Sequence, residues 1–214
     1  MNADPVEIRV LGCLIEKQRT TPDAYPLTLN ALRLACNQST NRDPVVDYDE
    51  ATIRAALDRL GRRRWTRLTS GHGSRTPKFR HLLDEALGLD RSELALLAVL
   101  MLRGPQTPGE LKQRTERLQH FDDIAAVEAA VDGLISRELV ARLARRPGQK
   151  EERYGQLIGG AETTAEAATE SAPEPRAVAA PAASDGLSAR VERLESDVAE
   201  LRAELVRLRE ELGA

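Results

Sequence analysis

The 214-residue sequence predicts a mainly α-helical α+β protein. In this fold class, two tandem winged-helix domains with small β wings precede a disordered linker and a C-terminal coiled-coil helix. Three observations lead to it: an internal repeat, a hairpin pattern at the end of each repeat, and a C-terminal leucine heptad. They place the two domains at residues 1–86 and 87–158, the linker at 159–186 and the coiled coil at 187–214.

The internal repeat is plainest in the third predicted helix of each domain. Residues 49–68 parallel residues 123–142 at a constant offset of 74, so that apolar positions coincide. The matched positions are Ile53 with Val127, Leu57 with Val131, Leu60 with Leu134 and Trp65 with Leu139. Each repeat has the order helix, helix, helix, strand, turn, strand, which is the order of a winged helix.

Three of the helices begin with the same local pattern. Asp4, Asp90 and Thr107 each place a side-chain oxygen at the N-cap, with a glutamate three residues later. This is the capping-box arrangement, in which two backbone N–H groups gain partners. A proline follows Asp4 and Thr107 directly, at the first helical position, where its missing N–H costs nothing.

After the third helix, residues 65–82 have two short extended arms around a Ser-Gly-His-Gly-Ser turn, and residues 139–157 turn at Arg-Pro-Gly-Gln. The loop at 36–49 is the main departure from the repeat. It has two interpretations. One is a polar recognition site made of Asn37, Gln38, Asn41, Arg42 and Asp43. The other is structural, with Asn and Asp capping and turning while Val45 and Val46 supply the short third strand of a winged helix.

Positive charge is concentrated in the first domain. Residues 54–80 contain nine basic residues against the single acid Asp58. The third helix is expected to bury Ile53, Ala56, Leu57 and Leu60, which leaves Ala51, Ala55, Asp58, Arg59 and Arg62 outward. We therefore predict a DNA contact through Arg54, Arg59, Arg62, Arg63, Arg75 and Lys78. The alternative is a solvated face whose arginines pair within the chain.

The second domain differs in charge. Its third helix is expected to present Glu128, Asp132 and Ser136, which would repel phosphate groups. Only its wing, with Arg145, Arg146 and Lys150, is basic in character, and Glu151 and Glu152 follow directly. We expect this domain to pack against the first one or to bind protein.

The linker is rich in Ala, Pro, Glu, Ser and Thr and has no large apolar periodicity. Behind it, apolar residues recur at alternating spacings of four and three, and the flanking charges match in a parallel pair. A parallel dimer is therefore predicted, with fold-back onto the chain or a trimer as alternatives. The seam consists of Leu187, Val191, Leu194, Val198, Leu201, Leu205, Leu208 and Leu212.

Catalytic and cofactor motifs are not found in the sequence. The three histidines lie outside any metal-binding or nucleophile motif, and no glycine-rich phosphate loop occurs. We expect no enzyme activity, no cofactor and no metal. Cys13 and Cys36 have apolar helical surroundings that predict buried free thiols. No apolar run approaches the roughly 20 residues that span a bilayer, and the N-terminus lacks a signal-peptide pattern, so a cytoplasmic location without membrane contact is expected.

Three long stretches resemble the YceH-like family of bacterial proteins. They are CLIEKQRTTPDAYPLTLNALRLACNQSTNRDP (13–44), LGLDRSELALLAVLMLRGPQTPGEL (87–111) and RPGQKEERY (146–154). The resemblance covers about residues 6–160. It implies tandem winged helices, and it implies no activity, because the family has no established active site.

Three functions remain open at this point. The first is a dimeric, non-enzymatic protein that contacts double-stranded DNA through the first winged helix. The second is a protein-interaction scaffold that resembles tandem winged-helix chromosome-segregation proteins and does not bind DNA. The third is a small-molecule sensor, for which a cavity between the domains would be needed.

Overall fold

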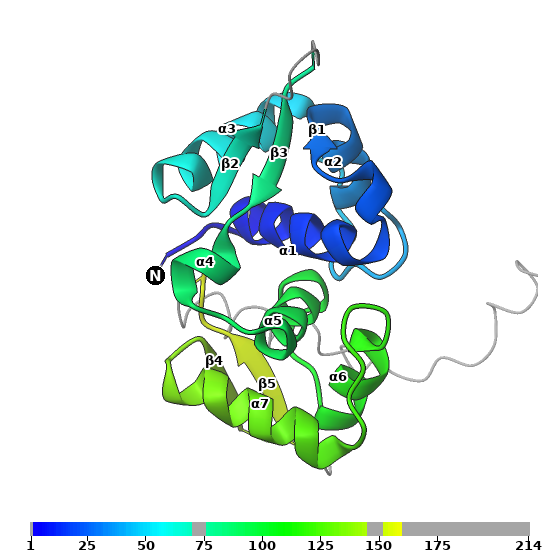
Figure 1. Ribbon diagram of the computed structural model, residues 1–214, viewed down its shortest axis with the longest axis vertical. Coiled ribbons are helices and arrows are strands. Elements are labelled where there is room, and N and C mark those ends of the chain that lie inside the picture. The colour runs from blue at the N-terminus through cyan, green and yellow to red at the C-terminus, as the bar shows by residue number, and fades with distance from the viewer. Residues whose placement is uncertain (1, 70–75, 145–151, 160–214) are drawn as a thin grey trace, which may run out of the picture. The chain divides into compact units, whose positions relative to one another are not determined.

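In the computed structural model, the described residues are 2–69, 76–144 and 152–159. They form seven α-helices and two small antiparallel sheets, a mixed α+β arrangement of the winged-helix kind (Figure 1). All of them belong to one compact unit. Residues 160–186 of the predicted linker, the coiled-coil seam at 187–212 and Arg75 lie outside the described residues.

The first half of this unit runs from α1 to β3. Its elements are α1 (Pro5–Thr20), the short 3-10 helix η1 (Pro22–Ala24), β1 (Leu27–Thr28), α2 (Leu29–Cys36), α3 (Glu50–Arg62), β2 (Thr66–Thr69) and β3 (Lys78–His81). The second half has the same order after the linking helix α4 (Leu83–Leu87). It consists of α5 (Arg91–Arg103), α6 (Pro108–Thr115), α7 (Ile124–Ser136), β4 (Val140–Leu143) and β5 (Arg153–Gln156).

Local sequence determines where the helices begin. The three predicted capping boxes are confirmed. The side chains of Asp4, Asp90 and Thr107 each accept a hydrogen bond from the backbone N–H of the glutamate three residues later. The side chain of that glutamate accepts a hydrogen bond from the backbone N–H of the cap residue. Asp49 caps α3 and Asp123 caps α7 in the same way, without the return bond. Equivalent helices of the two halves therefore begin with equivalent chemistry.

The third strand of the first sheet is not where the sequence placed it. Strand β1 pairs with β3, Leu27 opposite Phe79, and the strand order is β1-β3-β2. Val45 is 60% exposed and belongs to no strand, so the prediction for Val45 and Val46 was wrong. Residues 37–48 are held instead by hydrogen bonds from side chains of the loop itself. The second half repeats the true arrangement in reduced form, since Gln106, just before α6, forms a single bridge with Tyr154 of β5.

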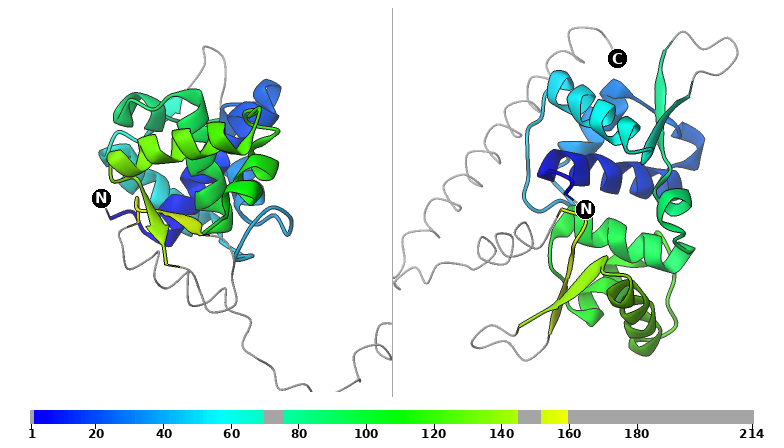
Figure 2. Two further views of the ribbon diagram at one scale, coloured as in Figure 1. Left: turned by 90° about the horizontal axis from the view of Figure 1, so that it is seen from below. Right: turned by 90° about the vertical axis from the view of Figure 1, so that its left-hand side faces the viewer.

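Helices α1 and α5 lie side by side at the centre of the unit, between the two sheets (Figures 1 and 2). Residues 7–15 of α1 and 94–102 of α5 are all buried. A helix that is buried on every side must be covered by more than one neighbour. Each of these helices therefore serves the core of its own half and the contact between the halves. The backbone N–H of Ala3 also donates to the carbonyl of Ile158, 3.0 Å away.

Gly12 allows α1 and α5 to approach closely. A Cβ atom at this position would lie 2.9 Å from Cγ and Cδ2 of Leu102 and 3.1 Å from Cβ of Met101. Real Cβ atoms are hardly ever found as close as the first of these distances, and the Cβ of Met101 cannot swing away. Gly12 is therefore the contact point that sets the spacing of the two central helices.

We expect Gly12→Leu to lower the free energy of unfolding by about 1–3 kcal/mol, because it overpacks this contact. The measurement is urea unfolding followed by circular dichroism. Gly61→Ala is the matched control, since nothing lies within 4 Å of a Cβ on Gly61. That change should raise stability by up to about 1 kcal/mol, because alanine favours the helix. A Gly12→Leu protein as stable as the wild type would contradict the close packing.

Candidate nucleic-acid interface

Helix α3 divides into a buried stripe and an exposed face, as its sequence predicts. Ile53, Ala56, Leu57 and Leu60 are buried. Arg54, Asp58 and Arg62 are exposed, and because they are four residues apart they lie along one face of the helix. The small residues Ala51, Ala55 and Gly61 are exposed as well. A helix face with short side chains among arginines can approach a surface closely.

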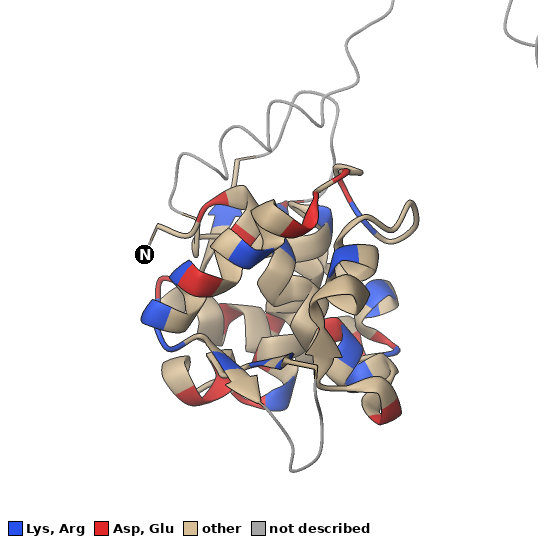
Figure 3. Ribbon diagram, turned by 90° about the horizontal axis from the view of Figure 1, so that it is seen from above, with Lys and Arg blue, Asp and Glu red and all other residues tan. Residues whose placement is uncertain are grey.

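Four basic residues of this region are exposed and form no ion pair with any residue that the structure describes: Arg54, Arg62, Arg64 and Arg67. We call them the free arginine face. Lys78, another predicted contact, is half-buried on β3, opposite Thr69 of β2. Figure 3 views the molecule from the side of α2, α3 and the wing, where basic and acidic positions are interspersed. The free arginine face is thus a local feature and not part of a wide basic field.

Two other predicted contacts are engaged inside the protein. Arg59 is 2.5 Å from the Asp4 carboxylate and 3.4 Å from that of Glu7. Arg63 donates to the carbonyl of Asn2 at 2.7 Å, and its guanidinium lies over the Trp65 ring at 5.4 Å. Their partner Glu7 is 1% exposed and also accepts the backbone N–H of Asp4 at 2.8 Å. These two arginines hold the start of α1 against α3. For them, the alternative of pairing within the chain applies.

The polar loop after α2 is anchored to the core by its own side chains. Asn37 bonds both backbone groups of Tyr48, at 2.8 and 2.9 Å. The side chain of Arg42 is fully buried, pairs with both carboxylate oxygens of Glu16 at 2.6 and 3.0 Å, and donates to the carbonyl of Ala35. These bonds support the structural interpretation of the loop. They also explain why residues 37–48 need no strand to stay in place.

The surface of the second half that corresponds to the free arginine face has acidic residues and paired arginines. Glu128, Asp132 and Ser136 are exposed on α7, as predicted. Arg142 on β4 is 3.4 Å from both Asp132 and Glu152, so its charge is balanced. The outer faces of the two equivalent helices therefore have opposite electrostatic character.

Cys13 and Cys36 are buried free thiols, as predicted. The Cys13 thiol donates to the carbonyl of Ala35 at 3.3 Å, which ties α1 to α2. No group of three or more candidate metal-binding side chains occurs among the described residues. Within the same part of the chain, no helix has the length and apolar character needed to cross a bilayer.

His81 at the end of β3 is a buried structural residue. It is 2% exposed, its Nε2 lies 2.7 Å from Oε1 of Gln18, and its backbone N–H donates to the Tyr25 hydroxyl at 2.8 Å. Because Gln18 Oε1 can only accept, Nε2 carries the hydrogen. Burial lowers the pKa of His81 from 6.5 to about 4, although Asp84 acts in the opposite direction. The ring is therefore neutral at pH 7.

Comparison with known proteins places the chain in a family. The family model described as a protein of unknown function, DUF480, matches residues 3–149. The chain belongs to this family. A UPF0502 protein of Geotalea daltonii is 53% identical over 80% of this chain and 78% of its own length. One from Klebsiella pneumoniae is 45% identical over 97% of this chain and 96% of its own. The resemblance to an uncharacterised bacterial family is confirmed.

The match to the DUF480 model and the alignments with the relatives end at different places in the chain. The model stops at residue 149, whereas a UPF0502 protein of Geotalea uraniireducens, 48% identical, aligns with 95% of this chain and 91% of its own length. That alignment is too long to leave out the predicted coiled-coil segment. The C-terminal segment therefore has a counterpart in UPF0502 relatives. Neither the DUF480 description nor these relatives' names mention an enzyme activity.

Sequence reasoning missed a second basic cluster. Arg103, Arg114 and Arg117 line a cavity of about 400 Å³ between α1, α5 and α6, together with Glu16. Burial lowers the pKa of Arg103, and the neighbouring charges of Arg114 and Arg42 act in the same direction. Arg103 ends α5, Arg114 lies on α6 and Arg117 follows α6, so only the packing of the helices brings them together.

The buried His81 predicts a pH dependence of stability. Its folded pKa of about 4 lies below the unfolded value of 6.5, so the unfolded state takes up the proton first as the pH falls. Stability should be complete above about pH 6.5 and decrease by up to about 3 kcal/mol as the pH falls to 4. Urea unfolding across this range tests it. His81→Gln should reduce the slope, whereas the exposed His120→Gln should not; parallel wild-type and His81→Gln curves would contradict the assignment.

Proposed function

We propose that this protein is a non-enzymatic tandem winged-helix protein that binds double-stranded DNA through the first of its two repeats. The observation that carries the proposal is the free arginine face on α3 and β2. Arg54 and Arg62 extend from one side of a helix that follows a helix-turn-helix order, and Arg67 lies on the adjoining strand. Arginines without carboxylate partners are suited to phosphate oxygens and guanine edges.

The repeated order of elements supports the winged-helix assignment. Each half has three helices followed by an antiparallel strand pair, and in each half the residue just before the second helix pairs with the last strand. In proteins of this kind the third helix enters the major groove. We therefore assign the DNA contact to α3 and not to α1 or α2.

The two halves are assigned different roles. The exposed acids Glu128 and Asp132 would repel phosphates, so α7 is not a groove-binding helix. The second half instead holds α5 against α1 and so fixes the position of the first. A protein that binds DNA with only one of its two winged helices needs a second copy for avidity. The predicted parallel coiled coil of residues 187–212 would supply it.

A protein-interaction scaffold is the second candidate, favoured by a separate observation. Arg59 and Arg63 are used inside the chain, and three large apolar side chains are more than half exposed in the first half. These are Leu34, Val45 and Leu68. A partner that covers them would not need DNA, and a protein with no duplex affinity in any salt would favour this candidate.

The DNA proposal predicts that the double variant Arg54→Ala/Arg62→Ala binds a random-sequence duplex more weakly. The slope of log K against log salt should fall by about two units, because two phosphate contacts are lost. Fluorescence anisotropy across a salt series measures both effects on the full-length protein. Binding that is absent, or that does not depend on salt, would contradict the proposal.

The matched control is Arg91→Ala/Arg117→Ala, which removes the same charge from exposed positions of the second half. It should leave most of the affinity intact; a larger loss than in the first double variant would place the DNA on the α5–α6 side. Arg59→Ala is not a fair test of contact. It removes the nearest cation to the buried Glu7 carboxylate, so we expect it to lower stability as well.

The coiled-coil prediction is tested by sedimentation. The full-length chain should sediment as a dimer, and a truncation after residue 159 as a monomer, because the heptad seam supplies the only self-association that we expect. Leu194→Asp/Leu201→Asp should dissociate the dimer by placing charge in the seam. A monomeric full-length protein at micromolar concentration would disprove the pairing, and a dimeric truncation would move it into the two repeats.

A further inference from the structure

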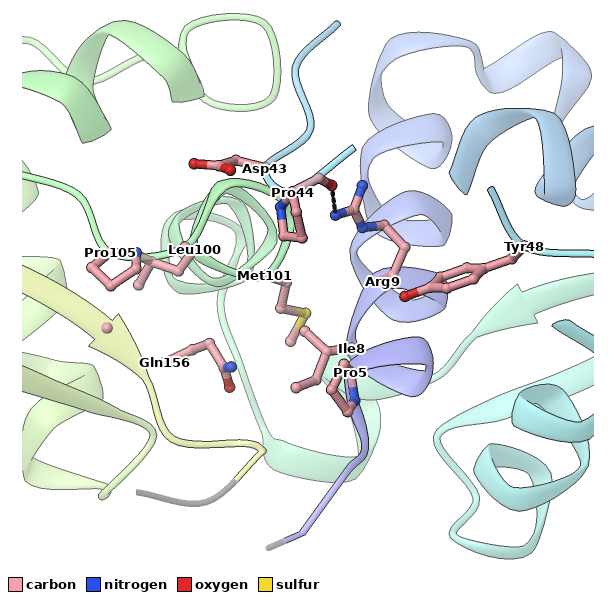
Figure 4. Close-up of a pocket in the computed structure, with 12 residues that line it drawn as sticks. Pro5, Ile8, Arg9, Asp43, Pro44, Tyr48, Leu100, Met101, Pro105 and Gln156 are labelled. Atoms are coloured by element: carbon pink, nitrogen blue, oxygen red, sulfur yellow. Dashed lines mark hydrogen bonds between the residues drawn. The ribbon is translucent and has the colours of Figure 1, made fainter. Parts of the chain in front are cut away.

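A small cavity of about 120 Å³ lies where the two halves meet (Figure 4). It is enclosed by α1, by residues 43–48, by the end of α5 and by β5, so each half supplies part of its wall. Most of its lining is apolar: Pro5, Ile8, Pro44, Leu100, Met101 and Pro105. An apolar cavity with few polar groups is the usual form of a small-molecule site.

Arg9 is the charged residue of this cavity that is almost wholly buried, with 3% exposure. Its guanidinium donates to the carbonyl of Pro44 at 2.5 Å and to that of Cys36 at 3.4 Å. No carboxylate of the described residues forms an ion pair with it. The neighbouring carboxylate of Glu16 accepts hydrogen bonds from both terminal nitrogens of Arg42.

The other groups that act electrostatically on Arg9 are Cys13, Arg42, Tyr48 and Cys36. Burial raises the pKa of Cys13, but its hydrogen bond with Cys36 and the charge of Arg42 lower it overall. The Cys13 sulfur nevertheless lies 3.3 Å from the carbonyl oxygen of Ala35, a contact in which the protonated thiol is the donor. The bond with Cys13, followed by burial, raises the pKa of Cys36, and burial raises that of Tyr48. Burial in turn lowers the pKa of Arg9. A buried cation without an anion is costly, and in proteins such a charge is ordinarily paired.

We propose that this cavity binds a small carboxylate ligand, whose carboxylate pairs with Arg9 and whose apolar body contacts Ile8, Leu100 and Met101. The ligand supplies the anion that the chain does not place beside Arg9. Because the cavity wall comes from both halves, the bound ligand joins them. This proposal does not depend on DNA binding.

The volume restricts the ligand to a short aliphatic chain, because a cavity of about 120 Å³ is smaller than one that holds a benzene ring. A dry protein cavity of about 150 Å³ accommodates benzene, whereas sites for drug-sized molecules and cofactors occupy about 300–1,000 Å³. Nucleotides and dinucleotides are therefore too large for a cavity of about 120 Å³. Phosphate esters are also better suited to the other cavity, which brings together Arg103, Arg114 and Arg117.

Asp43 also lines the cavity, and its charge requires an account. In Figure 4 its carboxylate points away from Arg9, with Pro44 between the two side chains. Asp43 acts on Arg103 and does not figure among the groups that act on Arg9. A carboxylate at Arg9 therefore does not have to lie against the Asp43 carboxylate.

Butyrate is the probe, with 1-butanol as its uncharged counterpart of similar size. Binding to the full-length protein is measured by calorimetry and by the thermal unfolding midpoint, at constant ionic strength. We expect butyrate to bind at least about ten-fold more tightly than 1-butanol, because a charge-assisted pair forms only with the carboxylate. Equal affinities, or no butyrate binding at millimolar concentration, would overturn the proposal.

Variants locate the binding. Ile8→Phe and Met101→Phe each fill the cavity and should abolish butyrate binding, and Arg9→Met should reduce the affinity for butyrate to that for 1-butanol. Arg103→Ala is the control from the other cavity and should leave binding unchanged. Loss of binding in Arg103→Ala, with retention in a folded Ile8→Phe or Met101→Phe, would overturn the assignment. If neither filled variant folds, the affinities of the two probes for the wild type and for Arg9→Met decide whether the carboxylate pairs with Arg9.

Discussion

The packing of α1 against α5 is the contact on which the rest of the structure depends. Residues 7–15 of α1 and 94–102 of α5 are buried on every side, so neither helix can be covered by the core of one half alone, and each covers what the other leaves open. Gly12 allows the two helices to approach closely. The Arg9 cavity and the second basic cavity both have walls from α1 and α5, so both follow from this arrangement.

Charge is distributed in layers around that contact. Arg9 and Arg42 lie deepest, where they bond backbone carbonyls and anchor the loop after α2. Arg59 and Arg63 form the next layer and hold the capped start of α1 against α3. The outermost arginines of α3, Arg54 and Arg62, are exposed. The depth of an arginine below the surface thus determines whether it bonds the backbone of a loop, pairs two helices or faces solvent.

Much of the fold could be predicted because it is encoded locally. Capping boxes at Asp4, Asp90 and Thr107 and the apolar stripe of α3 depend on residues within one or two turns. The role of Arg59 could not be predicted, because its partners Asp4 and Glu7 lie some fifty residues earlier in the chain. The third strand was misplaced for the same reason: Leu27 pairs with Phe79 across the sheet, and nothing near Val45 in sequence shows that its neighbours are held by side chains.

The two central helices hold equivalent places in the two repeats, so their contact resembles the interface of a symmetric dimer but lies within one chain. In a homodimer, every substitution would appear on both sides at once. Within one chain, the two sides can carry different residues. Arg54 and Arg62 of α3 correspond to Glu128 and Ser136 of α7 at the repeat's offset of 74 residues. The buried positions of α3 and α7 share one apolar pattern, whereas their outward faces differ in charge.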